Sequence, residues 1–112
     1  DIMIFEAAAG HGSLRNMKWL LDNKCPINHP KIMKSAIKHG SLINMKWLWE
    51  NGCSIEDRTI FDCAVYYGSR LRTLKWLLEN KCPVDKDGKS LAIKIFGSFE
   101  KLLILTFKVH VR

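Results

Sequence analysis

The sequence lacks the features that mark several classes of protein. No uninterrupted apolar run is long enough to cross a membrane, and no signal-peptide pattern occurs within the 112 residues. No two cysteines have the C-x-x-C spacing of a zinc site, and no G-x-x-x-x-G-K-[ST] loop is present to hold nucleotide phosphates. We therefore expect no membrane contact, no metal or other cofactor, and no catalysis.

Acidic residues are also few relative to basic ones. Eleven Asp and Glu stand against 18 Lys and Arg, which gives a net charge of +7. Such an excess attracts nucleic acids and acidic proteins over long range, although a charged surface more often serves only solubility. Apolar residues make up 47% of the chain, and the charges are mixed in sign, so a folded domain is expected.

What the chain does contain is a long repeated block. Residues 8–25 read A-A-G-H-G-S-L-R-N-M-K-W-L-L-D-N-K-C, and most of these residue types return 28 residues later and again 28 or 29 residues after that. A fixed period of this length indicates a repeat architecture, in which each unit buries its apolar face on its neighbours. The predicted units cover about residues 1–28, 29–56 and 57–85, with a divergent fourth unit at 86–112.

Each unit is predicted to be two helices joined by a Gly-Ser turn. In the first unit they cover residues 1–12 and 14–23, with Gly12 closing the first in a left-handed conformation and Ser13 capping the second. The second unit should have helices over 31–39 and 43–51, and the third a helix from Thr59 and another over 71–80. The fourth should have helices over 91–96 and 100–107.

The block Ala8-Ala9-Gly10-His11-Gly12-Ser13-Leu14…Met17…Leu20-Leu21…Asn23-Lys24-Cys25 resembles the ankyrin repeat, whose A-A-x-x-G-H-L-x-x-V-x-x-L-L-x-x-G-A pattern it follows position for position. Residues 59–64 and 85–90 are similar to that family's T-P-L-H-x-A helix opening and D-x-x-G-x-T turn. The resemblance implies an all-α, ankyrin-type solenoid of stacked helix-turn-helix repeats. It also implies a non-catalytic scaffold for protein–protein interaction.

The period is shorter than the family's usual length of about 33 residues. The missing residues lie between the units, where the family builds a β-hairpin finger, so short loops are expected there. The short period and the K-W-L-x-x-N-x-C-P pattern are similar to divergent ankyrin arrays of giant DNA viruses and some protists. That likeness implies a viral protein in the host cytoplasm, with the nucleus as the alternative.

The four cysteines agree with such a compartment. Cys25, Cys53 and Cys82 occupy the same repeat position, so they should lie about one helix–helix spacing, roughly 10 Å, apart. That distance is too long for a disulfide. Reduced, buried thiols are typical of cytosolic and nuclear proteins.

The resemblance also implies a recognition surface, because the family's partner-contacting positions lie on the first helices and the connectors. Carried over residue by residue, the partner-binding positions are His11, Lys34, Lys38, His39, Asp62, Tyr66, Tyr67, Arg58 and Lys86. Tyr66 and Tyr67 are the best anchors, since tyrosine is enriched among interface hot spots. The alternative is that both tyrosines pack within the stack.

Two further patterns carry open alternatives. His11 and His39 share a repeat position, but the repeat sets them on successive units, so we expect a surface or turn role in place of metal ligation. Lys18, Lys46 and Lys75 form one ladder, and Trp19, Trp47 and Trp76 form another. Such a stripe could stack the bases of RNA or DNA, but packing along the array is favoured, and Trp47 should then be less exposed than Trp19.

The last predicted helix is apolar on all sides over residues 102–107. A helix of this kind is normally buried, whereas the end of a repeat array should be polar. We expect it to be covered by a further part of the chain, a second copy or the partner. A structural subunit of a larger assembly therefore remains a third functional alternative, beside the protein-binding scaffold and the nucleic-acid binder.

Overall fold

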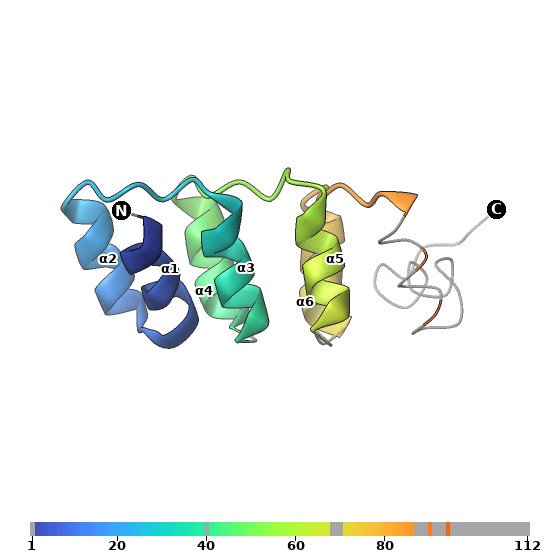
Figure 1. Ribbon diagram of the computed structural model, residues 1–112, viewed down its shortest axis with the longest axis horizontal. Helices are drawn as coiled ribbons and strands as arrows, with labels where there is room; N and C mark the ends of the chain where they lie inside the picture. The colour runs from blue at the N-terminus through green and yellow to red at the C-terminus, as the bar shows by residue number, and fades with distance from the viewer. Residues whose placement is uncertain (1, 40, 68–70, 87–89, 91–93, 95–112) are drawn as a thin grey trace. The chain divides into compact units, whose positions relative to one another are not determined.

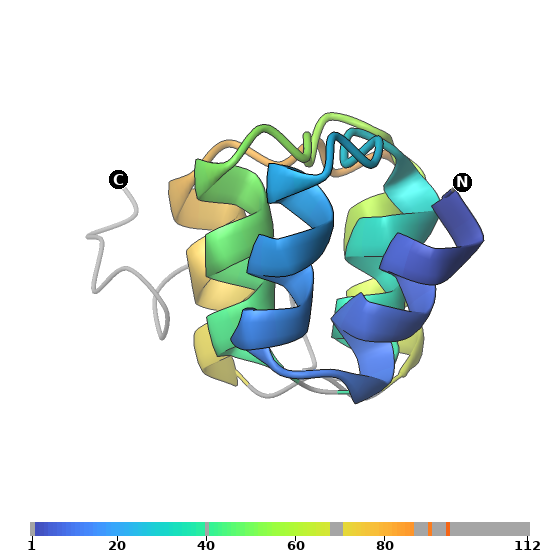
Figure 2. The ribbon, with the colours of Figure 1, turned by 90° about the vertical axis from the view of Figure 1, so that its left-hand side faces the viewer.

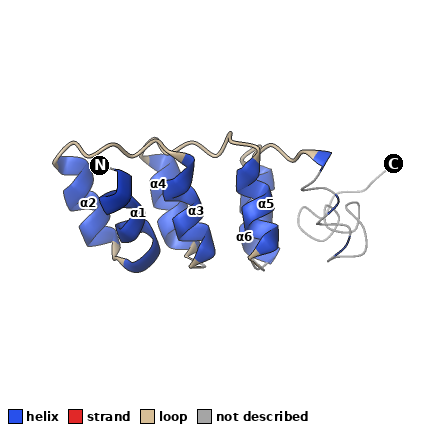
Figure 3. Cartoon of the chain, viewed as in Figure 1, coloured by secondary structure: helices blue, strands red, loops and turns tan. Residues whose placement is uncertain are grey.

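The structure is a computed structural model that describes residues 2–39, 41–67 and 71–86, together with residues 90 and 94. These residues form six helices and no strand (Figure 3). The helices are α1 (Ile2–His11), α2 (Leu14–Asp22), α3 (Pro30–Lys38), α4 (Leu42–Glu50), α5 (Thr59–Tyr66) and α6 (Leu71–Glu79) (Figure 1). The all-α prediction is confirmed for this part of the chain, and most helix ends lie within two residues of the predicted ones. The helices predicted over 91–96 and 100–107 fall outside the described residues, apart from position 94.

The chain divides into two compact units, Asp1–Ile55 and Glu56–Arg112. The first contains two helix pairs, α1 with α2 and α3 with α4. Figure 2 shows the first helices of the two pairs, α1 and α3, in one layer and the second helices, α2 and α4, in another. Among the described helices the most extensive contact is between α1 and α3. Its core consists of apolar side chains that recur one repeat apart, and Phe5, Met17, Ile32, Met33, Met45 and Leu48 are fully buried.

The second unit contains the pair α5 and α6. Phe61, Ile60 and Ala64 of α5 and Leu74 and Leu77 of α6 are fully buried. Thr59 opens α5 as predicted, and its backbone N–H donates to Asp57 Oδ1 at 2.8 Å. In the described part of the chain no helix is both long and apolar enough to span a bilayer.

The second helices of the described pairs, α2, α4 and α6, end with the same arrangement of hydrogen bonds. An Asn side chain caps each helix by donating from Nδ2 to the carbonyl of the Trp four residues earlier, at 2.8 Å in each case (Asn23, Asn51 and Asn80). The next residue has a positive φ (Lys24 61°, Gly52 106°, Lys81 63°). The Cys after it donates its N–H to the Leu carbonyl five residues back, at 2.9 to 3.0 Å. This is the Schellman closure of a helix, and it explains why Trp, Leu, Asn and Cys recur at fixed spacing.

Ser13 caps the start of α2, as predicted, and Ser41 caps the start of α4 in the same way. Ser13 Oγ accepts from the Asn16 N–H at 3.4 Å, and Ser41 Oγ accepts from the Asn44 N–H at 3.2 Å. The prediction for Gly12 is wrong, because Gly52 is the one described glycine with a positive φ. Gly12 instead donates to Ala8 O at 2.8 Å, and a Cβ built on it would also lie 2.8 Å from that oxygen. Glycine is needed there for space.

The connector between the two pairs of the first unit is short. His29 caps α3, with its Nδ1 accepting from the Lys31 N–H at 3.1 Å, and Pro30 takes the first helical position, where a missing N–H costs nothing. Asn28 Oδ1 accepts from the Ser54 N–H at 3.0 Å, which ties this connector to the next one. No strand occurs in either connector, 23–29 or 51–58. The prediction of trimmed loops without a β-finger is therefore confirmed at these positions.

Candidate functional site

The predicted surface of the first unit gathers around two histidines. His11 ends α1 and His39 follows α3, and their ring centroids lie 4.1 Å apart with the planes tilted by 59°. The pairing follows from the repeat, because α1 packs on α3 and residues one period apart become neighbours. Our expectation that successive units would keep these imidazoles apart is therefore wrong. In the described residues no group of three or more His, Cys, Asp or Glu side chains is placed to hold a metal ion.

A shallow hollow of about 400 Å³ adjoins this pair. Its polar lining is contributed by Glu6, His11, Lys31, Ser35, Lys38 and His39. Ser35 Oγ donates to the carbonyl oxygen of Glu6 at 2.8 Å and so fixes α3 against α1. Two lysines against one carboxylate make the lining basic.

Gly10 allows the two helices to approach so closely. A Cβ built on it would lie 2.6 Å from Ser35 Oγ and 2.7 Å from His39 Cδ2. A larger residue would therefore displace the side chains that shape the hollow. Of the predicted contact residues in this unit, His11, Lys38 and His39 meet at the hollow, whereas Lys34 is half-buried and is not part of its lining.

The second unit exposes the two tyrosines that were proposed as anchors. Tyr66 is 74% exposed and Tyr67 is 50% exposed, and their rings meet edge to face at 5.1 Å. Arg58 and Lys86 are exposed as well. Asp62 differs from the expectation, because it is half-buried and lies close enough for its charge to act on the thiol of Cys82. Asp62 is therefore less accessible than Arg58, Tyr66 and Tyr67.

The two tryptophans of the ladder that lie in the first unit differ in environment: Trp19 is exposed and Trp47 is packed. The indole of Trp47 stacks on the ring of Phe5, with centroids 6.5 Å apart and planes 25° from parallel. Trp47 is half-buried, whereas Trp19 is 63% exposed, so the predicted order of exposure is confirmed. Because one face of the Trp47 indole lies on Phe5, that face cannot stack on a nucleotide base. Packing along the array is thus supported for Trp47.

Sequence reasoning missed Asn44 as a contact residue. It is only 8% exposed, and its Nδ2 donates to the carbonyl oxygen of Ala9 at 3.1 Å, across 35 residues of sequence. The sequence contained a signal for it, because Asn recurs at positions 16 and 44, one repeat apart. A polar residue that recurs in this way can form a hydrogen bond between neighbouring repeats.

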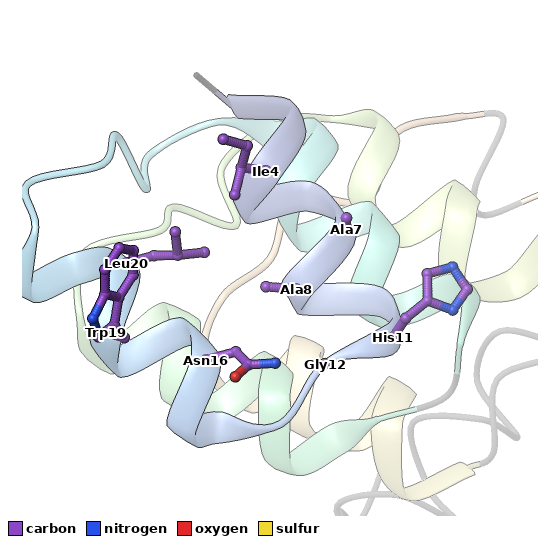
Figure 4. Close-up of a pocket in the computed structure, with 8 residues that line it drawn as sticks. All are labelled: Ile4, Ala7, Ala8, His11, Gly12, Asn16, Trp19 and Leu20. Carbon is purple, nitrogen blue, oxygen red and sulfur yellow. The ribbon is translucent and has the colours of Figure 1, made fainter.

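A second hollow, of about 470 Å³, was also missed (Figure 4). Its lining comes from α1, α2 and the turn between them, and no residue of α3 or α4 contributes to it. Figure 4 shows Ile4 and Ala8 of α1 facing Trp19 and Leu20 of α2 across it, with Asn16 near its lower end.

None of the four cysteines forms a disulfide, and they differ in burial. Cys53 and Cys82 are buried as predicted, whereas Cys25 and Cys63 are only half-buried. Burial raises the pKa of the Cys53 thiol. Burial, helped by the charges of Asp62 and Asp57, raises the pKa of Cys82 to about 12. Such thiols are protonated and unreactive near neutral pH.

Comparison of this chain with protein-family models, with curated proteins and with solved structures gives no match. The functional interpretation therefore rests on the residues and their geometry.

Proposed function

We propose that this chain is a non-catalytic protein-binding scaffold, built as an ankyrin-type solenoid of stacked helix-turn-helix repeats. The observation that carries the proposal is a difference between the residues that recur from repeat to repeat and those that vary. Most of the apolar residues that recur between repeats form the core, and recurring Ser and Asn residues cap the helices, with Asn23, Asn51 and Asn80 making the same bond. Residues that vary between repeats, among them Lys38 and Tyr66, lie exposed on or beside the first helices.

In the first unit the binding surface is centred on the hollow beside His11 and His39. Lys31 and Lys38 outnumber Glu6 in its lining, and the chain as a whole carries +7. An acidic segment of a partner protein would be attracted to this surface and could accept hydrogen bonds from its ammonium and imidazole groups. In the second unit, Tyr66 and Tyr67 supply rigid aromatic area of the kind that dominates protein interfaces.

The test is selection of displayed peptides on the folded chain, followed by affinity measurements on charge variants. We expect enriched peptides to be acidic and to lose about tenfold or more in affinity for a Lys31→Glu, Lys38→Glu variant, because this change removes two close charge pairs. The matched control is Lys18→Glu, Lys46→Glu, which changes the net charge equally on exposed positions of α2 and α4. Equal losses in both variants, or failure to enrich any peptide, would argue against the proposed surface.

A further inference from the structure

The hollow in Figure 4 is lined by residues whose counterparts one repeat later already have partners. Adding 28 residues converts Ile4, Asn16 and Trp19 into Ile32, Asn44 and Trp47. Asn44 donates to Ala9 O at 3.1 Å, and Trp47 stacks on Phe5 at 6.5 Å. His39, the counterpart of His11, packs its ring on His11 at 4.1 Å. Asn16 and Trp19 of the first repeat are thus the same residue types that the second repeat uses, at Asn44 and Trp47, to bind the first, whereas the His11 ring is already engaged with His39.

The equivalent residues of the first and second repeats differ in burial. Ile32 is fully buried, whereas Ile4 is 57% exposed. Asn44 is buried and Asn16 is exposed, and Trp19 is more exposed than Trp47. An apolar face of this kind is uncommon on the outside of a terminal repeat, which is normally polar so that the array stays soluble. The first repeat has the composition of an interior repeat.

We propose that this face is a docking site for another helix-turn-helix repeat of the same kind, carried by the same polypeptide array and packed on α1 and α2 as these pack on α3 and α4. Its first helix would place an apolar side chain on Trp19, where Phe5 meets Trp47. It would also present a main-chain carbonyl to Asn16 Nδ2, where Ala9 meets Asn44. The inference rests on contacts inside the first unit, and does not depend on the proposed binding partner.

The chemistry of the face favours this occupant over a second copy meeting it symmetrically. Asn44 uses a backbone carbonyl on α1, and Ser35 uses another, that of Glu6. A symmetric dimer would pack this face on the same face of a second copy, whereas the Phe5 ring and the Ala9 carbonyl that bind Trp47 and Asn44 belong to the opposite face of the first repeat. One contact would be weaker than in the interior, because Ala7 stands where Ser35 stands and lacks the hydroxyl.

The first experiment compares the protein isolated from its natural source with the 112-residue chain by hydroxyl-radical footprinting. We expect Trp19 to be oxidised rapidly in the 112-residue chain and to be protected in the natural protein, with the exposed Trp49 as an internal reference in both. Cross-linking should place a segment of the same polypeptide against Trp19. The inference is overturned if Trp19 reacts equally in both samples, or if a second copy or a different protein provides the protection.

The second experiment uses one substitution in two backgrounds. A copy of residues 1–28 is joined ahead of Asp1, which preserves the 28-residue period. In the 112-residue chain, Trp19→Lys should leave the urea midpoint almost unchanged, because the side chain is exposed. In the extended chain it should lower the midpoint by about 1 M or more, as expected for loss of a buried aromatic. Trp47→Lys should be costly in both backgrounds and serves as the control.

Equal small shifts for Trp19→Lys in the two backgrounds would show that the added repeat does not dock, and would overturn the inference. These readouts use no peptide or partner. The docking inference can therefore be refuted without affecting the proposed binding surface, and the binding surface can be refuted without affecting the docking inference.

Discussion

Two lysines of the described chain adopt a left-handed backbone conformation that side chains with a Cβ rarely take. Lys24 and Lys81 have φ near 60°, and they stand where Gly52 closes the equivalent helix. The left-handed conformation costs a residue with a Cβ roughly 1–2 kcal/mol. The hydrogen bonds of the helix closure and the packing of the following Cys offset this cost.

Replacing these lysines by glycine should therefore stabilise the protein. We expect Lys24→Gly and Lys81→Gly each to raise the free energy of unfolding by up to about 1 kcal/mol, since the relief of strain exceeds the added flexibility of the unfolded chain. Urea denaturation measures the change. Gly52→Lys is the matched control and should lower stability, although a Cβ there meets nothing within 4 Å. A loss of stability in both lysine variants would contradict the explanation.

Burial of the cysteines predicts an order of reactivity. Cys53 and Cys82 should react slowly with a thiol reagent in the folded protein and rapidly in denaturant, because they are buried and their pKa values are raised. Cys25, at the same repeat position but half-buried, should react faster. Mass spectrometry of timed samples measures the three rates. Rapid labelling of Cys82 in the folded state would contradict the structure.

The raised pKa of Cys82 also gives a dependence of stability on pH. Well below pH 9, the ordinary pKa of the thiol, both the folded and the unfolded thiol are protonated, so stability is unaffected there. Between pH 9 and about 12 only the unfolded thiol ionises, and the free energy of unfolding should fall as the pH rises. Cys82→Ala should reduce this fall, and the difference between the two titration curves isolates the thiol from other groups.

At the scale of the elements, a buried hydrogen bond from the Asn44 side chain to the Ala9 carbonyl joins the two helix pairs of the first unit. Asn44→Ala removes the donor to Ala9 O and leaves that buried carbonyl with one partner fewer. We expect a loss of about 1–2 kcal/mol in urea denaturation. Asn16→Ala changes the same repeat position where it is exposed, and should cost little beyond its effect on helix propensity. Equal costs would show that the bond between repeats contributes nothing.

The stacked indole offers a second matched pair. Trp47→Ala removes the ring that lies on Phe5 and should destabilise the protein by up to roughly 3–5 kcal/mol, the range for large buried aromatics. Trp19→Ala removes an exposed ring at the equivalent position and should cost far less. Thermal or urea unfolding followed by circular dichroism avoids reliance on tryptophan fluorescence. A small effect of Trp47→Ala would leave its packing role unsupported.

The elements show which features could be predicted from the sequence. The period, the helix limits and the serine caps follow from local residue types that agree with one another, such as Ser13 before an apolar stripe. Lys24 could not be foreseen as left-handed, because local preference favours Gly and only the surrounding bonds force the conformation. The neighbouring positions of His11 and His39, and the bond from Asn44, depend on which helices of adjacent repeats touch. Which helices touch is decided by tertiary packing and cannot be read from local residue types. Once α1 is known to pack on α3, the 28-residue period predicts that residues such as His11 and His39 are neighbours.

For the whole molecule, the sequence indicated an all-α fold, and the described residues agree. Of the residues predicted to bind a partner, His11, Lys38 and His39 meet at one hollow, and Tyr66 and Tyr67 are exposed, so their role in binding stays a prediction. The partial burial of Asp62 could not be predicted, because it depends on packing around α5 that residue types alone do not reveal. The apolar segment at 102–107 lies outside the described residues, so its predicted covering remains a prediction.

The net charge of +7 leaves nucleic acid as the main competing partner class, and the geometry makes a prediction about it. Trp47 is engaged with Phe5, so in the first unit Trp19 is the ladder residue best placed to stack a base. A stacked base is worth about 1–3 kcal/mol per aromatic. We expect single-stranded RNA to bind weakly through charge alone, and Trp19→Ala to leave its affinity unchanged within about twofold. Raising the salt from about 50 to 200 mM should abolish that binding.

The measurement is fluorescence anisotropy of a labelled oligonucleotide, with Lys18→Gln and Lys46→Gln as charge controls. If charge alone holds the RNA, each lysine change should weaken binding slightly and remove about one unit from the dependence of log affinity on log salt. Loss of tenfold or more on Trp19→Ala, with binding that survives 200 mM salt, would favour a nucleic-acid surface over the acidic protein partner. Such a result would move the functional site from the hollow beside His11 and His39 to the outer face of α2.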